Sequence, residues 1–240
     1  MGRSMVVVLL ALLLGGCGIR IETGGGTPPA PATASRAPTS SDGSAVSVAD
    51  TRVERAPAPD TRADDERTAV QISDAFWRSW FRDQGRRYVS PRVAGGYTGT
   101  GGPRCAGEPS VPGNAYYCPS GNFLAWDENL MRAGYTQIGD AWVYLVIAHE
   151  WGHAIQAQLP RRLVARQIEL QADCLAGAAL QGASDQGLVR IEEGDDEEIQ
   201  RTLAAVADDY PWTDESSHGN AQQRISAFRT GLSGVDACLG

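Results

Sequence analysis

The sequence predicts an α+β fold that is mainly α, with a small β element, between residues 67 and 240. Two observations predict this fold. Several segments repeat apolar residues at the spacing of an amphipathic helix. Between residues 85 and 126, short apolar pieces lie among many Gly and Pro residues, a pattern typical of loops and short strands. We therefore expect one domain of packed helices beside a small sheet.

The first 17 residues predict a lipoprotein signal peptide. Arg3 precedes a short apolar run, Val6–Leu14, which is shorter than the roughly 20 residues that a membrane-spanning helix needs. The sequence Leu-Gly-Gly-Cys that ends at Cys17 resembles a bacterial lipobox, which implies cleavage before Cys17 and a lipid on its thiol. An ordinary secretory signal peptide cut nearby is the alternative. Both predict an exported, extracytoplasmic protein, anchored in the cell membrane if Cys17 carries lipid.

Residues 18–66 are rich in Gly, Pro, Ala, Thr and Ser and poor in large apolar residues. Such a composition cannot form a core, so the segment is predicted to be a disordered tether. The whole chain has a formal net charge of −8 and no basic stripe, which argues against a nucleic-acid partner. The acidic run at residues 192–198 is interpreted as a solvated segment.

The first half of the domain is predicted as a helix, loops and short strands. Thr68–Gln84 has an aromatic stripe at helical spacing, which is interpreted as core packing. Short extended pieces are expected at Tyr88–Val89, Ala115–Cys118 and Phe123–Trp126. A further helix is expected to begin after Asp127 as its cap and to end at Gly134.

The central feature is the sequence His-Glu-Trp-Gly-His at residues 149–153, in an apolar helix predicted from Asp140, as its cap, to Leu159. Residues four apart share one helix face, so His149 and His153 can bind one metal ion. Glu150 can reach a water molecule bound to that metal. Two of the three His residues of the chain lie here, in apolar surroundings where unpaired polar groups would be costly.

A second helix is predicted from Arg161 to Ala183, and it carries two carboxylates four residues apart. We assign Glu169 as the third zinc ligand, which leaves a fourth position for water. Asp173 is assigned to orient a His ring, with His149 as the first candidate. The swapped assignment, with Asp173 as the ligand, is the closest rival.

Four Cys residues remain after Cys17, an even number that suggests disulfides in an exported chain. Three connectivities are possible. We favour Cys105–Cys118, which closes a short loop, and Cys174–Cys238, which would tie the C-terminal segment to the core.

Two more helices are predicted at residues 193–209 and 220–231, with the third His of the chain between them. Hydrolysis of an amide requires a donor for the oxyanion that forms at the carbonyl. His218 is the candidate and Tyr210 the weaker one, although a structural hydrogen bond is an alternative role for His218. Arg224 is expected either to pair with a carboxylate near the site or to lie at the surface.

Together these motifs resemble the putative neutral zinc metallopeptidase family of bacteria, over about residues 67–240. The resemblance implies a zincin-like fold with a Glu ligand, one zinc ion per chain and peptides or proteins as substrate. Asn220 and Ala221 depart from it, because the family usually has small hydroxyl residues there. The matching segments are residues 117–119, 149–153, 169–177, 207–209 and 217–224.

The sequence thus predicts a zinc-dependent peptidase of the cell envelope, with Glu150 as the general base for water attack. The alternative is a catalytically silent, zinc-containing binding module. In that module a fourth protein ligand would close the zinc site, and His218 is the remaining His that could supply it. Hydrolysis of another amide, such as a cell-wall peptide crosslink, is a weaker third possibility.

Overall fold

The computed structural model describes residues 61–214 and 217–239. The predicted signal peptide, the lipidation site Cys17 and nearly all of the predicted tether lie outside these residues. None of the helices within the described ranges is long and apolar enough to cross a membrane.

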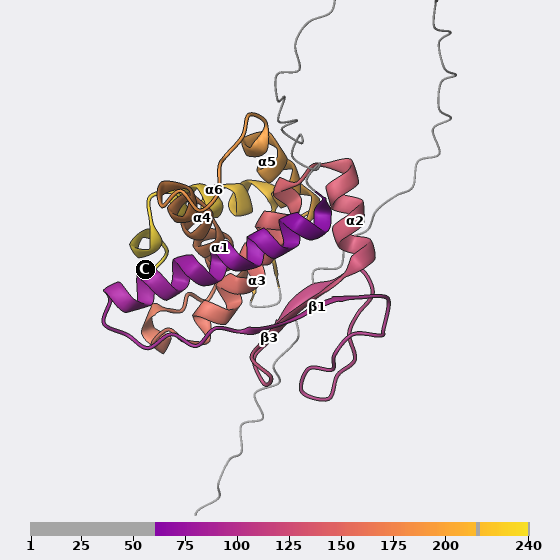
Figure 1. The fold of residues 1–240 in the computed structure, drawn as a ribbon, viewed down its shortest axis with the longest axis horizontal. Helices are drawn as coiled ribbons and strands as arrows, with labels where there is room; N and C mark the ends of the chain where they lie inside the picture. Colours follow the sequence, from indigo (N-terminus) through magenta and orange to yellow (C-terminus); the bar gives the residue numbers. More distant parts are fainter. Residues whose placement is uncertain (1–60, 215–216, 240) are drawn as a thin grey trace, which may run out of the picture. The chain divides into compact units, whose positions relative to one another are not determined.

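The described residues form a mainly helical structure with one three-stranded sheet, as the sequence predicts (Figure 1). Two 3-10 helices, at Arg161–Leu163 and Val235–Cys238, lie in the second half of the described residues. The helices are α1 (Arg62–Asp83), α2 (Glu128–Gln137), α3 (Ala141–Gln156), α4 (Ile168–Asp185), α5 (Asp195–Ala205) and α6 (Ala221–Gly231), and the strands are β1 (Arg92–Tyr97), β2 (Ala115–Cys118) and β3 (Phe123–Asp127).

Helix α1 packs against α3 and α4, and its aromatic residues enter the core as predicted. It begins before the predicted start at Thr68, because the Thr61 side chain caps it by accepting from the backbone N–H of Asp64. A partly buried contact also holds its first turns, where the Tyr144 hydroxyl of α3 donates to Asp65 over 3.2 Å.

The sheet has the order β1-β3-β2, with β2 antiparallel and β1 parallel to β3. The strands predicted near residues 115 and 123 are confirmed, but the extended piece expected at Tyr88–Val89 is not a strand. Strand β1 lies in the Gly-rich segment that was predicted to be loop. Its pairing shifts between Val93 and Gly95, where the glycine has a φ of +82°, so it lacks the alternation that marks a strand in sequence.

Asp127 caps α2 as predicted, by accepting from the backbone N–H of Asn129. The prediction that Gly134 ends this helix is wrong, because the helix continues to Gln137. A Cβ atom on Gly134 would lie 2.0 Å from the indole ring of Trp142. The glycine therefore gives room for α3 to pack against α2.

The predicted cap of α3 is also wrong. Asp140 makes no capping hydrogen bond, and Glu198 of α5 accepts from the backbone N–H of Ala141 over 3.2 Å instead. The backbone N–H at the start of α3 is therefore bonded by a side chain from a helix distant in sequence, and not by the neighbouring Asp140. The single helix predicted from Arg161 is divided into a 3-10 turn and α4.

Helices α3 and α4 cross closely at Gly152, where an added Cβ would lie 2.9 Å from the carbonyl oxygen of Ala172. The glycine inside the motif is therefore required by this approach, which puts the two sequence motifs side by side. The structure forms both favoured disulfides, Cys105–Cys118 and Cys174–Cys238, and the second joins α4 to the segment after α6.

Candidate metal centre

Helices α3 and α4 bring the three predicted ligands together. The ligand atoms of His149, His153 and Glu169 all lie within 4.8 Å of one another. Oε2 of Glu169 is 3.2 Å from Nε2 of His149, and Oε1 is 3.4 Å from Nε2 of His153. His149 and Glu169 are buried and His153 is nearly so. Two imidazole nitrogens and a carboxylate oxygen form the donor set that zinc takes in catalytic sites.

Asp173 holds His149, as predicted from its position on α4. Nδ1 of His149 donates to Oδ1 of Asp173 over 2.8 Å, which leaves Nε2 facing Glu169. Arg224 of α6 donates to both oxygens of Asp173, from Nε and Nη2, each over 2.8 Å. Its Nη1 donates to the carbonyl of Val206 over 2.7 Å. Of the two roles considered for Arg224, the structure therefore places it on the buried carboxylate and not at the surface.

The electrostatics of the cluster favour a bound cation. Burial alone lowers the pKa of His149, but the carboxylates of Asp173 and Glu169 raise this pKa to about 10. Burial raises the pKa of Glu169, but the two imidazoles hold it well below its ordinary value. Without metal, protons on the rings balance the buried carboxylates. A divalent cation supplies that positive charge directly, so the residues present fit zinc.

The ring of His153 has a different partner. Its Nδ1 lies 2.9 Å from Oε1 of Gln156, one turn further along α3. Gln156 in turn donates to Gln171 of α4. Sequence reasoning missed both glutamines, although the spacing of three residues between His153 and Gln156 is a signal that could have found the first.

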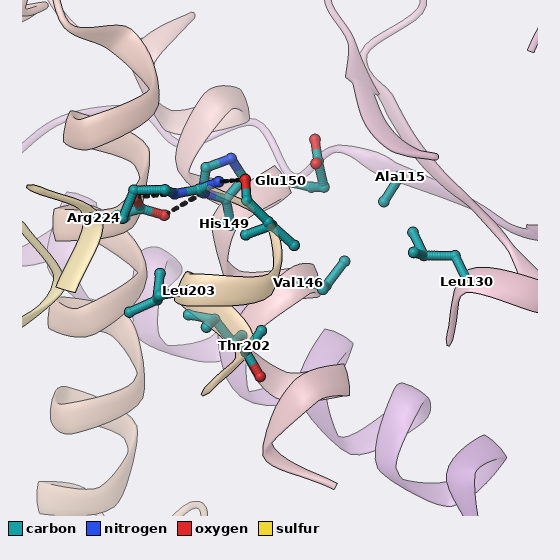
Figure 2. A pocket seen from close by; sticks show the side chains of 11 residues that line it. Ala115, Leu130, Val146, His149, Glu150, Thr202, Leu203 and Arg224 are labelled. Carbon is teal, nitrogen blue, oxygen red and sulfur yellow. Dashed lines mark hydrogen bonds and ion pairs between the residues drawn. The ribbon is translucent and has the colours of Figure 1, made fainter. Parts of the chain in front are cut away.

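Glu150 is buried beside His149 but does not belong to the ligand group. It lines a cavity next to the metal centre, together with His149 (Figure 2). A carboxylate beside the ligands, and outside them, is where a general base must lie.

The structure does not bring His218 into the ligand group. It lies in the loop before α6, where Asp208 accepts from the backbone N–H groups of His218 over 2.7 Å and of Gly219 over 3.2 Å. Oδ1 of Asp208 is 3.4 Å from Nδ1 of the His218 ring. The other ring nitrogen, Nε2, is buried and has no hydrogen-bond partner among the described residues. Tyr210 is 53 % exposed.

Comparison with known families gives one result. A family model described as "Putative neutral zinc metallopeptidase" matches residues 5–162 and 161–238. The chain belongs to this family. The resemblance seen in its motifs is thereby confirmed, and the zinc in the family's description agrees with the donor set of α3 and α4. No curated protein and no solved structure gives a significant match.

Removal of the guanidinium from the buried pair should be costly. We expect Arg224→Met to lower the free energy of unfolding by about 3–5 kcal/mol, because it leaves the Asp173 carboxylate buried without its cation. Urea denaturation of the metal-free protein measures this loss. Arg229→Met is the matched control, since Arg229 is exposed on the same helix and should change stability by less than about 0.5 kcal/mol. Equal losses for both variants would contradict the assignment.

Proposed function

We propose that this protein is a zinc-dependent metallopeptidase that hydrolyses peptide bonds with Glu150 as the general base. One observation carries the proposal: two His and one Glu form a three-membered ligand group, and Glu150 lies beside it without joining it. The family supports the same activity through its description. The substrates are peptides or proteins.

Each residue of the site has a separate role in the proposed reaction. A zinc ion bound there would supply Lewis-acid chemistry, through a polarised substrate carbonyl and a more acidic water molecule. Glu150 accepts a proton from the attacking water and then delivers it to the nitrogen of the broken peptide bond. His149, His153 and Glu169 would hold the cation, and Asp173 keeps the His149 ring in one orientation.

His218 is proposed to donate a hydrogen bond to the oxyanion that develops at the substrate carbonyl. The support is its ring geometry: Asp208 lies at Nδ1, and Nε2 is buried without a partner in the described ranges. Asp208 also holds the backbone of the loop, so it positions the ring. Because Asp208 accepts at Nδ1, Nε2 donates to the oxyanion when the ring carries both protons, as an imidazolium.

The alternative of a catalytically silent binding module requires a zinc site closed by four protein ligands. The ligand group in the described part of the chain has three members, and His218 is not among them. This observation favours the peptidase, because it leaves a coordination position for water.

We place the enzyme outside the cytoplasm, anchored in the cell membrane through lipid on Cys17. The support is the sequence of the first 17 residues and the two disulfides, since such bonds persist mainly in oxidising compartments.

The carboxylate of Glu150 is tested by Glu150→Gln. We expect this variant to bind zinc as the parent does and to lose about 100- to 10,000-fold in kcat, because the amide cannot accept the proton. Cleavage of a diverse peptide mixture, followed by mass spectrometry beside a zinc assay, measures both quantities. Glu197→Gln, at an exposed position of α5, should cleave like the parent. A Glu150→Gln protein with full activity would refute the mechanism.

The two candidates for the oxyanion donor are separated by His218→Asn and Tyr210→Phe. We expect His218→Asn to lower kcat by about 100- to 1,000-fold with zinc binding retained, the loss typical of one missing oxyanion donor. Tyr210→Phe should be close to the parent. If zinc dissociates from His218→Asn, the residue is a ligand and the binding module gains support.

A further inference from the structure

A small apolar cavity lies beside the metal centre, between α3, α5 and the start of β2 (Figure 2). The cavity is small, and its volume of about 370 Å³ includes the open solvent at its mouth. His149 and Glu150 form one wall. The apolar part of the lining includes Ala115, Leu130, Leu145, Val146, Leu203 and Val206.

Two of the charged side chains that border this cavity already have partners. Asp173 and Arg224 also border it, but they pair with each other through two hydrogen bonds. An anionic substrate side chain would therefore lose its water without gaining a partner, which is costly. A cationic side chain would pair with Glu150 and so occupy the carboxylate that the proposed mechanism needs as a base. An aliphatic side chain would bury apolar surface at no such cost.

The position of Glu150 decides which substrate residue enters. Under the proposed function, Glu150 delivers a proton to the scissile nitrogen, so this nitrogen must come within hydrogen-bond reach of the carboxylate. The nitrogen and its residue's side chain are attached to the same Cα atom. A side chain in the cavity that Glu150 borders therefore belongs to the residue on the amine side of the broken bond.

Strand β2 offers a path for the substrate backbone to this cavity. The backbone N–H of Asp127 donates to the carbonyl of Asn114, and Ala115 faces Trp126 in the next, non-hydrogen-bonded pair. The N–H and C=O of Ala115 therefore point to the outer edge of β2, which is an edge strand. Ala115 also lines the cavity, so an extended peptide beside β2 would pass its mouth.

We propose that this cavity selects a medium-sized aliphatic side chain on the amine side of the cleaved bond. This inference rests on the proposed peptidase function and gives its substrate class: peptides cut immediately before residues such as Leu, Val or Ile.

The test uses the zinc-loaded protein and a peptide library, with every cleavage site read by mass spectrometry. We expect aliphatic residues on the amine side to be favoured over Gly by about 10- to 200-fold in kcat/KM. Val206→Ala should shift the preference to larger side chains and Val146→Leu to smaller ones. Val189→Ala, outside the cavity, is the control for Val206→Ala and should leave the preference unchanged. Cleavage without this preference, or with it on the carbonyl side, would overturn the proposal and leave the peptidase function standing.

A binding measurement distinguishes failure of the cavity proposal from failure of the proposed peptidase function. Leu-Ala and Asp-Ala, which resemble products with a free amine, are titrated into zinc-loaded Glu150→Gln protein by calorimetry. Tighter binding of Leu-Ala, weakened by Val146→Leu, supports the cavity even if no substrate is cleaved. Equal binding of the two dipeptides overturns it.

A different observation concerns the buried glutamines behind His153. Both hydrogens of the Gln171 amide go to backbone carbonyls, of Leu163 over 2.7 Å and of Cys238 over 3.0 Å. Its oxygen must then face the donors on its other side, the N–H of Ala165 at 3.0 Å and Nε2 of Gln156 at 3.2 Å. Backbone groups thus fix the orientation of this amide.

The fixed amide of Gln171 in turn determines the orientation of the Gln156 amide. Its Nε2 donates to Gln171 and to the carbonyl of Ile168 over 2.7 Å, so its oxygen faces Nδ1 of His153. An acceptor at Nδ1 requires a proton there. In the neutral ring the lone pair is then on Nε2, the nitrogen that faces Glu169.

We infer that Gln156 is a positioning residue that holds His153 in its metal-binding tautomer, and that Gln171 keeps Gln156 in place. Because Cys238 belongs to the disulfide with Cys174, the C-terminal segment supports the ligand set through this chain of hydrogen bonds.

Zinc affinity, measured by competition with a chelator, tests this role. We expect Gln156→Leu to weaken zinc binding by about 10- to 100-fold. Gln156→Glu keeps an acceptor oxygen for Nδ1 of His153 but loses the donors to Ile168 and Gln171, so it should be less stable in urea while its zinc affinity stays within about threefold of the parent. Gln222→Leu, at an exposed position of α6, is the control. A merely structural role would destabilise both Gln156 variants in urea and leave both affinities unchanged, and that result would overturn the inference.

Discussion

The site depends on one buried carboxylate. Asp173 is fully buried and receives two hydrogen bonds from Arg224 and one from His149. A charge at such a depth requires partners on every side. It therefore fixes three helices against one another: α4 carries the carboxylate, α3 the imidazole and α6 the guanidinium. The ligand geometry follows from this arrangement, because the His149 ring can take only the orientation in which Nε2 faces Glu169.

Both ligand-bearing elements are helices whose packing leaves little freedom. The close crossing at Gly152 sets the distance between α3 and α4, and the Cys174–Cys238 disulfide fastens the far side of α4. Nδ1 of His149 is hydrogen-bonded to a carboxylate, and Nδ1 of His153 to an amide oxygen. The two rings therefore differ in their support: one partner carries charge, whereas the other is neutral and is itself held by a backbone carbonyl and the side chain of Gln171. Such supports keep ligands in place before any metal arrives.

The parts of this site that sequence alone predicted are those encoded by short-range spacing. The site residues come in pairs four apart on a helix: His149 with His153, and Glu169 with Asp173. Helix geometry puts the two members of each pair on the same face. Gln171 and Asp208 carry no such signal, because most of their partners are backbone groups that do not stand at a helical interval from them.

The errors in the fold have the same origin. Gly134 was interpreted as a helix end by a local rule, but the Trp142 ring of another helix explains it. Asp140 was interpreted as a cap, but a carboxylate from α5 took that place. Local rules describe one helix at a time, so a contact between helices can override them without leaving a trace in the nearby sequence.

The order of these contacts along the chain has a consequence for when the centre can form. The carboxylate of Asp173 lacks its cation until Arg224 has been made, and Gln171 lacks one of its acceptors until Cys238 has followed. Contacts of such long sequence separation form late, since the closure of long loops is slow. Before these contacts form, the chain carries its candidate ligands without the groups that hold them in place. The metal centre is therefore complete only after the C-terminal helix α6 and the segment that follows it have packed against α4.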